Sequence, residues 1–224
     1  MALMLERKVQ EQTQEFLKKK YRRKAKSNRI FSQLEIRTKK KYGGKRADGF
    51  IAFRHLLFGE YVVSIEAKSR KTLPAIKPYL DHFLLIKNSV KAGLTFCILS
   101  GAFFFLYKNP DGLFQFLVPL YAFGISGLIY ALLTWNSYRH KTIDVLDQLK
   151  QYPANEQWLA FSKDSFEALK KENQKKLRKI CKSRGVGLII VSRKVIVLEK
   201  PKWKWGRRFL KYYAKEKEVA EFLN

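Results

Sequence analysis

The sequence is short of cysteine, histidine and acidic residues, and each shortage argues against a class of site. Its two cysteines, Cys97 in an apolar run and Cys181 in a basic segment, disfavour an intramolecular disulfide and indicate a reducing compartment. The three histidines, His55, His82 and His140, lack the spacing of a metal-binding motif. No glycine-rich phosphate loop, nucleophile elbow or cysteine cluster occurs. Carboxylates and amines are therefore the groups left to carry chemistry.

Internal repeats and low-complexity linkers are also absent, and the N-terminus becomes charged too early for a cleavable signal peptide. Lys and Arg total 46 against 19 Asp and Glu, a formal net charge of +27. A field of this sign attracts polyanions, and both nucleic-acid phosphates and anionic lipid headgroups fit it. The 224 residues are 46% hydrophobic, which is enough for a domain with a core and excludes a disordered chain.

Two long apolar runs interrupt this basic chain. Residues 92–107 are uncharged and reach only about 24 Å as a helix, so extension back to about residue 88 is needed to match a hydrocarbon core of about 30 Å. Residues 113–135 need no extension, and the turn-forming sequence KNPDG joins the two runs. We expect a transmembrane helical hairpin with spans at about 88–107 and 113–135, inside an insertion of residues 71–141 that begins with a membrane-proximal helix.

The charges beside the hairpin predict its orientation. Lysines precede it and a basic run, Arg139 to Lys141, follows it, whereas the connecting turn carries one Lys and one Asp. By the positive-inside tendency, both termini and the folded domain are expected on the cytoplasmic side of the inner membrane. The alternative is a helical hairpin buried in a soluble domain, although this apolar region is longer than such a domain usually buries in one piece.

Outside the hairpin, hydrophobic periodicity predicts an α/β fold. The first expected helix, residues 3–21, has Leu5, Val9, Thr13 and Phe16 on its inner face. The expected strands are 30–37, 47–54, 60–69, 157–162 and two within 185–200, and the further expected helices are 142–152 and 165–184. The core is thus formed by residues 1–70 and 142–200, and residues 201–224 are expected to be a basic, aromatic C-terminal helix.

The strand EYVVSIEAKS, residues 60–69, ends in two charged residues. Successive side chains of a strand alternate between its faces, so Glu66 and Lys68 project from the same face. The preceding strand carries Asp48, and these two strands are expected to form an antiparallel hairpin. One interpretation of Glu66 and Lys68 is an exposed ion pair, which contributes at most about 1 kcal/mol to stability.

This hairpin resembles the PD-(D/E)xK, or restriction-endonuclease-like, nuclease superfamily. The motif stands here as RADGFIAF with Asp48, then 17 intervening residues, then IEAK with Glu66 and Lys68. Ala47 occupies the position where the family usually has proline. The resemblance covers about residues 1–70 and 142–200, and it implies a mixed sheet flanked by helices, here interrupted by the transmembrane hairpin.

The resemblance also implies a metal site. Asp48, Glu66 and the backbone carbonyl of Ala67 are expected to hold Mg²⁺ or Mn²⁺ beside a phosphodiester, because these ions prefer oxygen ligands. Lys68 is expected to orient or help deprotonate the attacking water and to stabilise the developing charge. Glu6 matches the additional acid that the first helix often contributes in this superfamily, with a solvated residue at the helix edge as the alternative.

QLKQY, residues 148–152, is similar to the Q-x-x-x-Y helix of the branch that includes recombination-type exonuclease domains. The spacing places Gln148 and Tyr152 on one helix face, where they are expected near the site. Ordinary surface residues are the competing interpretation. Trp203 and Trp205, among lysines and arginines, fit either base stacking or a place at the bilayer interface or in the core, and the second is favoured.

Basic segments outside the motif are expected to contact phosphates without reading sequence. The residues concerned are Arg22, Arg23, Lys24, Lys45, Arg46, Lys175, Lys176 and Arg178. The expected function is a membrane-anchored, Mg²⁺-dependent nuclease acting on DNA, with defence against foreign DNA by analogy alone. The alternative is a non-catalytic membrane adaptor whose basic domain binds nucleic acid or anionic lipid. RNA as substrate, endonucleolytic or exonucleolytic cleavage, and a homo-oligomer or partner subunit all stay open.

Overall fold

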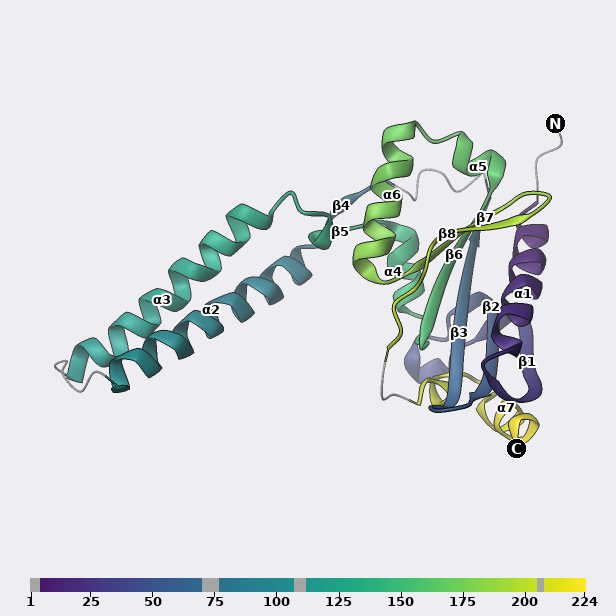
Figure 1. Ribbon diagram of the computed structural model, residues 1–224, viewed down its shortest axis with the longest axis horizontal. Coiled ribbons are helices and arrows are strands. Elements are labelled where there is room, and N and C mark those ends of the chain that lie inside the picture. The colour runs from purple at the N-terminus through teal and green to yellow at the C-terminus, as the bar shows by residue number, and fades with distance from the viewer. Residues whose placement is uncertain (1–4, 70–76, 107–111, 205–207) are drawn as a thin grey trace. The chain divides into compact units, whose positions relative to one another are not determined.

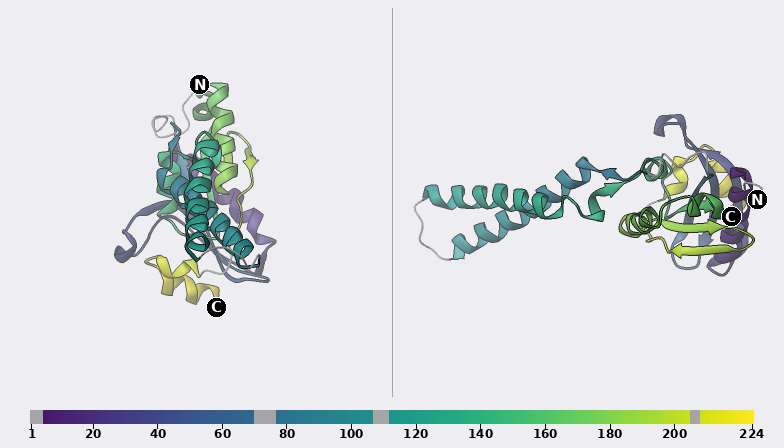
Figure 2. Two further views of the ribbon diagram at one scale, coloured as in Figure 1. Left: turned by 90° about the vertical axis from the view of Figure 1, so that its left-hand side faces the viewer. Right: turned by 90° about the horizontal axis from the view of Figure 1, so that it is seen from above.

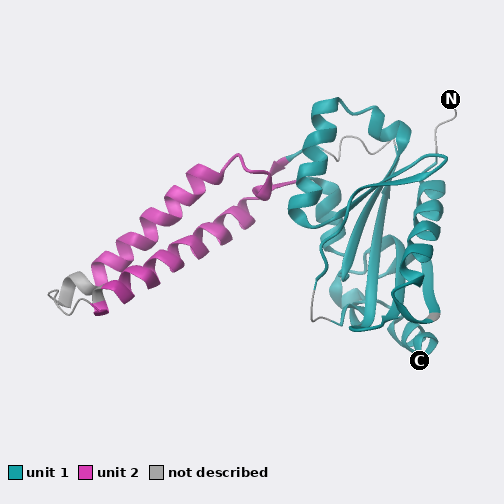
Figure 3. Cartoon of the chain, viewed as in Figure 1, with its two compact units in different colours: residues 1–78, 143–224 teal, residues 79–142 magenta. Residues whose placement is uncertain are grey.

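The computed structural model describes residues 5–69, 77–106, 112–204 and 208–224. The chain divides into two compact units (Figure 3), unit 1 with residues 1–78 and 143–224 and unit 2 with residues 79–142. The main elements of unit 1 are α1 (Glu6–Arg22), β1 (Ala25–Arg37), β2 (Arg46–His55), β3 (Gly59–Lys68), α4 (Asp144–Lys150), β6 (Glu156–Ser162), α5 (Lys163–Glu167), α6 (Lys171–Arg184), β7 (Gly187–Val191), β8 (Val195–Glu199), η4 (Phe209–Tyr212) and α7 (Glu216–Leu223). Those of unit 2 are β4 (Tyr79–Leu80), α2 (His82–Leu106), α3 (Gly112–Thr134) and β5 (Lys141–Thr142).

Unit 1 is built on a six-stranded mixed sheet with the order β1-β2-β3-β6-β7-β8 (Figure 1). The first three strands form an antiparallel meander, β3, β6 and β7 run parallel, and β8 returns antiparallel to β7. A parallel pair needs a long connection, and the chain joins β3 to β6 through unit 2 and α4. The mixed α/β class and the antiparallel β2–β3 hairpin expected from the sequence are confirmed.

Helix α1 covers one face of the sheet, and α4 and α6 lie on the other (Figure 1). The residues of α1 that face the sheet, Val9, Thr13, Leu17 and Tyr21, recur every four positions and are fully buried. Leu5, expected on this inner face, precedes the helix and is exposed. The periodic pattern therefore identified the buried stripe but placed its start one turn too early.

Alternation along β3 decides which side chains meet which layer. Val63, Ile65 and Ala67 belong to the core beneath α1. The even-numbered residues point to the opposite face, where the Ser64 hydroxyl donates to the Tyr152 carbonyl at 3.2 Å. The end of β3 thus presents Glu66 and Lys68 to the layer that contains α4 and the segment after it.

The boundaries of three expected elements are corrected. Strand β1 begins at Ala25 rather than residue 30, so part of the expected basic connector is strand. The helix expected at 142–152 ends at Lys150. The basic helix expected at 165–184 is divided into α5 and α6 at Lys170, whose backbone is extended, and the amide of Gln174 donates to the carbonyls of Phe166 and Leu169 that the end of α5 leaves without helical partners.

The termini of the insertion and of the chain also differ from expectation. No separate membrane-proximal helix occurs among residues 77–81, and α2 begins at His82 and continues directly into the first apolar run, whereas residues 70–76 lie outside the described part. Among residues 201–204 and 208–224, the C-terminal segment is helical only in η4 and α7, and Trp205 lies outside the described residues.

In unit 2, α2 and α3 lie side by side as an antiparallel pair (Figure 2). Both are long and apolar enough to cross a membrane, over His82–Phe103 and Phe116–Thr134, and only 11% and 6% of these windows are buried. A Cβ added to Gly93 would lie 2.8 Å from Phe123, so glycine is what allows the two helices to approach closely. At the base of the pair, Tyr79 pairs with Thr142 and Leu80 with Lys141. So little burial disfavours the alternative of a hairpin enclosed in a soluble core.

Candidate functional site

The β2–β3 register brings the two predicted carboxylates together. Gly49 pairs with Ile65 across the antiparallel ladder, so continuing the register by one residue places Asp48 opposite Glu66 on the same face. An Asp48 carboxylate oxygen accepts a hydrogen bond from the backbone N–H of Ala67 at 2.8 Å. The N–H and C=O of a strand residue face the same neighbouring strand, so the Ala67 carbonyl also faces β2. The three expected metal ligands are therefore adjacent.

Lys68 lies beside this pair. Its Nζ atom is 2.6 Å from Glu66 Oε1, and the two residues are only 8% and 4% exposed. The interpretation of Glu66 and Lys68 as an exposed ion pair is therefore wrong, because this is a buried pair. Burying two charges carries a desolvation cost of several kcal/mol per ion that a single contact offsets only in part. A buried ion pair of this kind therefore adds little to the free energy of folding.

The environment of Glu66 disfavours its charged form. Burial, reinforced by the negative charge of Asp48, raises the pKa of Glu66 to about 7, although Lys68 acts in the opposite direction. The pKa of Asp48 is also raised, mainly by burial. Glu66 Oε2 is buried and has no hydrogen-bond partner among the described atoms. This carboxyl group has an acceptor atom to offer and would be stabilised in its charged form by a cation.

Glu6 reaches the same end of β3 from the first turn of α1. Its carboxylate accepts a hydrogen bond from the Ser69 hydroxyl at 3.1 Å, and its charge contributes to raising the pKa values of Asp48 and Glu66. Ser69 was missed by the sequence analysis, although it directly follows the Glu-x-Lys motif. Glu6 and Asp48 are half-buried rather than enclosed, so the site meets solvent on their side.

The donor set fits a divalent cation of the Mg²⁺ type. Within the described ranges, no three His, Cys, Asp or Glu side chains converge in a metal-binding group. Two carboxylates and a backbone carbonyl remain, and Mg²⁺ is commonly held by one or two carboxylates together with waters and substrate phosphates. Glu66 Oε2, buried and unpartnered within the described part, is the atom best prepared to coordinate such an ion.

Tyr152 and Gln148 do not share the helix face expected for them. Tyr152 follows the end of α4 and is buried, whereas Gln148 is exposed. Burial raises the pKa of Tyr152 to about 12, and the charges of Glu66 and then Asp48 add to this shift. The Tyr152 phenol is therefore a protonated group near both carboxylates. A place for Gln148 near the site stays a prediction.

The predicted phosphate-binding cations lie in three separate places. Lys45 and Arg46 flank the start of β2, next to Asp48, with Arg46 Nη1 3.3 Å from Glu35. The cations at the end of α1, Arg22, Arg23 and Lys24, lie at the opposite end of the sheet, where the Lys24 carbonyl accepts from the Leu56 N–H. The β2 group is therefore next to the candidate site, and the α1 group is at the far end of the sheet.

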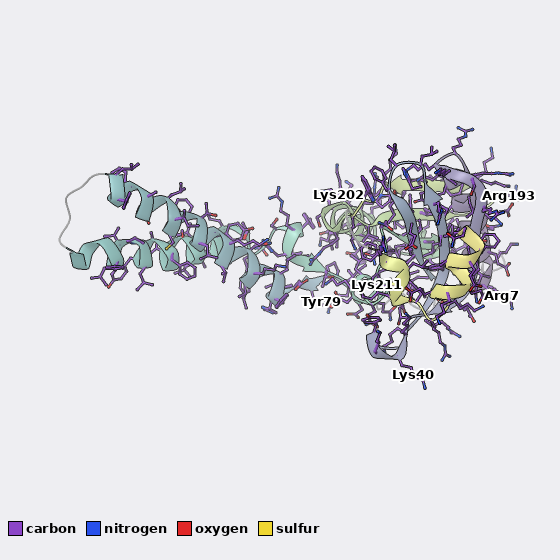
Figure 4. The ribbon with its side chains drawn as sticks, turned by 90° about the horizontal axis from the view of Figure 1, so that it is seen from below. Arg7, Lys40, Tyr79, Arg193, Lys202 and Lys211 are labelled. Atoms are coloured by element: carbon purple, nitrogen blue, oxygen red, sulfur yellow. The ribbon has the colours of Figure 1, made fainter. Side chains whose placement is uncertain are left out.

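The third group is on α6. Lys175 is exposed, whereas Lys176 and Arg178 form ion pairs with Glu172 at 2.5 Å and with Glu199 at 3.0 Å. Basic side chains such as Lys40, Arg193 and Lys211 extend from several sides of unit 1 (Figure 4). The positive charge is therefore distributed over the unit rather than confined to one track.

Comparison of the chain with protein-family models, with curated proteins and with solved structures finds no match. The assignment of a function therefore depends on the site itself.

Proposed function

We propose that this chain is a membrane-anchored, divalent-cation-dependent nuclease that hydrolyses phosphodiester bonds of DNA. The observation that carries the proposal is the buried pair of Glu66 and Lys68 beside the half-buried Asp48, in which Glu66 Oε2 lacks a partner among the described atoms. An acid from one strand, an acid two residues before a lysine on the next, and a neighbouring backbone carbonyl can supply the metal ligands and the positive charge that metal-assisted phosphodiester hydrolysis uses.

Each residue has a role that its position supports. Asp48, Glu66 and the Ala67 carbonyl would hold Mg²⁺ or Mn²⁺, which when bound polarises the phosphate and lowers the pKa of a coordinated water. Lys68 positions the attacking water and donates to the oxygens that gain negative charge as the P–O bond of the leaving group breaks. The protonated hydroxyl of Tyr152 supplies a further donor beside the carboxylates.

The fold and the membrane helices are consistent with this function. A helix, an antiparallel meander and a parallel strand reached by a crossover support a restriction-endonuclease-like core. The two apolar helices would form an inner-membrane anchor, with unit 1 and both termini cytoplasmic because the basic residues flank the hairpin. DNA that enters the cytoplasm would be the substrate, and a role in defence against foreign DNA is proposed by analogy alone.

One observation favours a second function. Glu66 and Lys68 are 4% and 8% exposed, so the pair could be a structural remnant in a non-catalytic membrane adaptor. Such an adaptor would use the +27 net charge to bind nucleic acid or anionic lipid. The two functions differ in one measurable property, since only the nuclease breaks covalent bonds.

The test is cleavage by the purified full-length protein in detergent. Supercoiled plasmid, linear DNA and RNA are incubated with Mg²⁺, Mn²⁺ or EDTA, and products are separated on denaturing gels. We expect cleavage of DNA that EDTA abolishes, and a loss of about a hundredfold or more in Asp48→Asn and Lys68→Met. Lys163→Met, an exposed lysine on α5, is the matched control.

Thermal unfolding of each variant shows whether it is folded. Equal cleavage by the wild-type protein and folded Asp48→Asn would reject the nuclease. Nucleic-acid or vesicle binding without cleavage in any metal would favour the adaptor.

A further inference from the structure

A second candidate site lies at the other end of β3. A cavity of about 600 Å³, which we call the turn cavity, is formed by the β2–β3 turn (residues 54–60), Asn155, Lys26 of β1, and Trp203 and Arg208 from the segment after β8. Its volume is within the range of small-molecule pockets. Seven residues of extended strand separate Gly59 from Glu66, or about 23 Å. The turn cavity is therefore distinct from the carboxylate site.

One wall of the turn cavity is aromatic. The ring centroids of Phe58 and Trp203 are 4.0 Å apart, and those of His55 and Phe58 are 4.6 Å apart. Phe58 is 38% exposed, whereas Trp203 is half-buried and packs against the core beneath α1. A rigid set of rings with an accessible edge offers a surface on which a flat heterocycle can stack.

The cavity is also positively charged. Lys26, Arg54 and Arg208 are exposed cations in its lining, and Glu60 is the one carboxylate among the described residues that line it. Arg54 donates to the Asn224 side chain, which holds one side of its guanidinium. A guanidinium presents paired donors that match phosphate oxygens.

Hydrogen bonds of His55 and Asn155 fix the lining of the turn cavity between the rings and the cations. His55 Nδ1 accepts the Leu57 N–H at 3.1 Å, so Nε2 carries the proton of the neutral ring, and burial lowers the pKa of His55. Asn155 accepts the Val62 N–H at 2.8 Å and donates to the Lys204 carbonyl at 3.2 Å. The turn is thus held in place before any ligand arrives, which reduces the entropy cost of binding.

We propose that the turn cavity binds a nucleotide, with the base against Phe58 and Trp203 and the phosphates between Lys26, Arg54 and Arg208. The combination of aromatic rings and cations favours a nucleotide over other classes of ligand. An anionic lipid headgroup supplies the negative charge without a flat ring, and a simple aromatic compound supplies the ring without the charge. The inference goes beyond the proposed nuclease and does not depend on it, because the two sites are at opposite ends of the sheet.

Calorimetric titration of the full-length protein in detergent, with EDTA present, tests the proposal. The probes are ATP, adenosine, inorganic tripolyphosphate and vesicles of phosphatidylglycerol. We expect ATP to bind with one site per chain, and adenosine and tripolyphosphate to bind about tenfold more weakly or worse. If tripolyphosphate binds as tightly as ATP, or only the vesicles bind, the protein merely attracts polyanions and the proposal is wrong.

Substitutions then assign the site. Arg208→Gln and Phe58→Leu are each expected to weaken ATP binding about tenfold. The matched controls Arg193→Gln, in the β7–β8 turn, and Phe222→Leu, on α7, should change it less than twofold. Unchanged ATP binding in folded Arg208→Gln and Phe58→Leu would overturn the assignment.

Competition distinguishes a free nucleotide from the end of a nucleic-acid strand. Linear single-stranded DNA and covalently closed single-stranded circles are added separately to the ATP complex. Displacement by the linear strand alone indicates a strand end, and displacement by neither indicates a free nucleotide, both of which support the proposal. Equal displacement by circles and linear strands would indicate binding along the backbone and contradict it.

Discussion

Replacing Glu66 with glutamine should remove a pH dependence from the stability of unit 1. In the folded chain without metal, burial and then Asp48 raise the pKa of Glu66 from 4.5 to about 7. A carboxyl with a raised pKa binds its proton more tightly in the folded state than in the unfolded one. The stability it contributes is therefore fully present below pH 4.5 and is lost as the pH rises through about 7.

The size of the effect follows from the shift. A difference of about 2.5 pKa units corresponds to about 3 kcal/mol, because one unit is about 1.4 kcal/mol. Glu66 is 4% exposed, so solvent screening removes little of this. A neutral glutamine has no charge to bury. Glu66→Gln should therefore unfold at a temperature about 6 to 12 °C above the wild-type protein at pH 8.5, and near it at pH 5.

The assay is thermal unfolding of both proteins in detergent with EDTA, at intervals from pH 5 to pH 9. The exposed acid Glu221 provides the control Glu221→Gln, which should show the wild-type profile. Adding Mg²⁺ at pH 8.5 should stabilise the wild-type protein but not Glu66→Gln, since the cation compensates the buried charge. A difference between Glu66→Gln and the wild-type protein that stays constant from pH 5 to pH 9 would refute the reasoning.

Three further substitutions test close contacts within unit 1 and within the helical pair of unit 2. Gly187→Ala should cost about 3 kcal/mol, because the new Cβ would stand 2.3 Å from the Trp158 ring; a thermal shift below 2 °C would contradict this contact. Tyr21→Phe should cost about 2 kcal/mol by removing a buried hydrogen bond to Glu156, measured by the same unfolding assay, and an unchanged melting temperature would show that the bond is absent. Gly93→Leu should separate the two helices of unit 2, which loss of a disulfide between cysteines engineered on α2 and α3 would report; undiminished cross-linking would count against the close approach.

The elements whose apolar residues recur at a regular spacing were predictable from the sequence. Strict alternation in residues 60–69 placed Glu66 and Lys68 on one face, and the β2–β3 register then placed Asp48 opposite. The start of β1 was not predictable, because β1 is an edge strand and an edge tolerates basic residues that show no apolar alternation. The division between α5 and α6 was not predictable either, because the free carbonyls at the end of α5 are satisfied by the side chain of Gln174, a contact that helix propensity does not include.

The site was predictable in its residue types but not in its environment. Alternation placed Glu66 and Lys68 on one face and the resemblance to the PD-(D/E)xK superfamily added Asp48, but their burial depends on how the segment after α4 covers the sheet. The same segment carries Tyr152 beyond the helix end, which separates it from Gln148. The turn cavity could not have been predicted from any short stretch of sequence, because Lys26, the β2–β3 turn, Asn155, Trp203 and Arg208 come together only in the folded chain.

The short β4–β5 ladder makes unit 2 replaceable by a short linker. It holds the outgoing and returning strands side by side, so their paired Cα atoms stand about 5 Å apart. A linker of a few glycines and serines could therefore replace residues 79–142 without requiring β3 or β6 to shift. The proposed anchor is in this sense removable, and we expect its excision to leave a unit 1 in which the Asp48–Glu66 carboxylate pair can be studied without detergent.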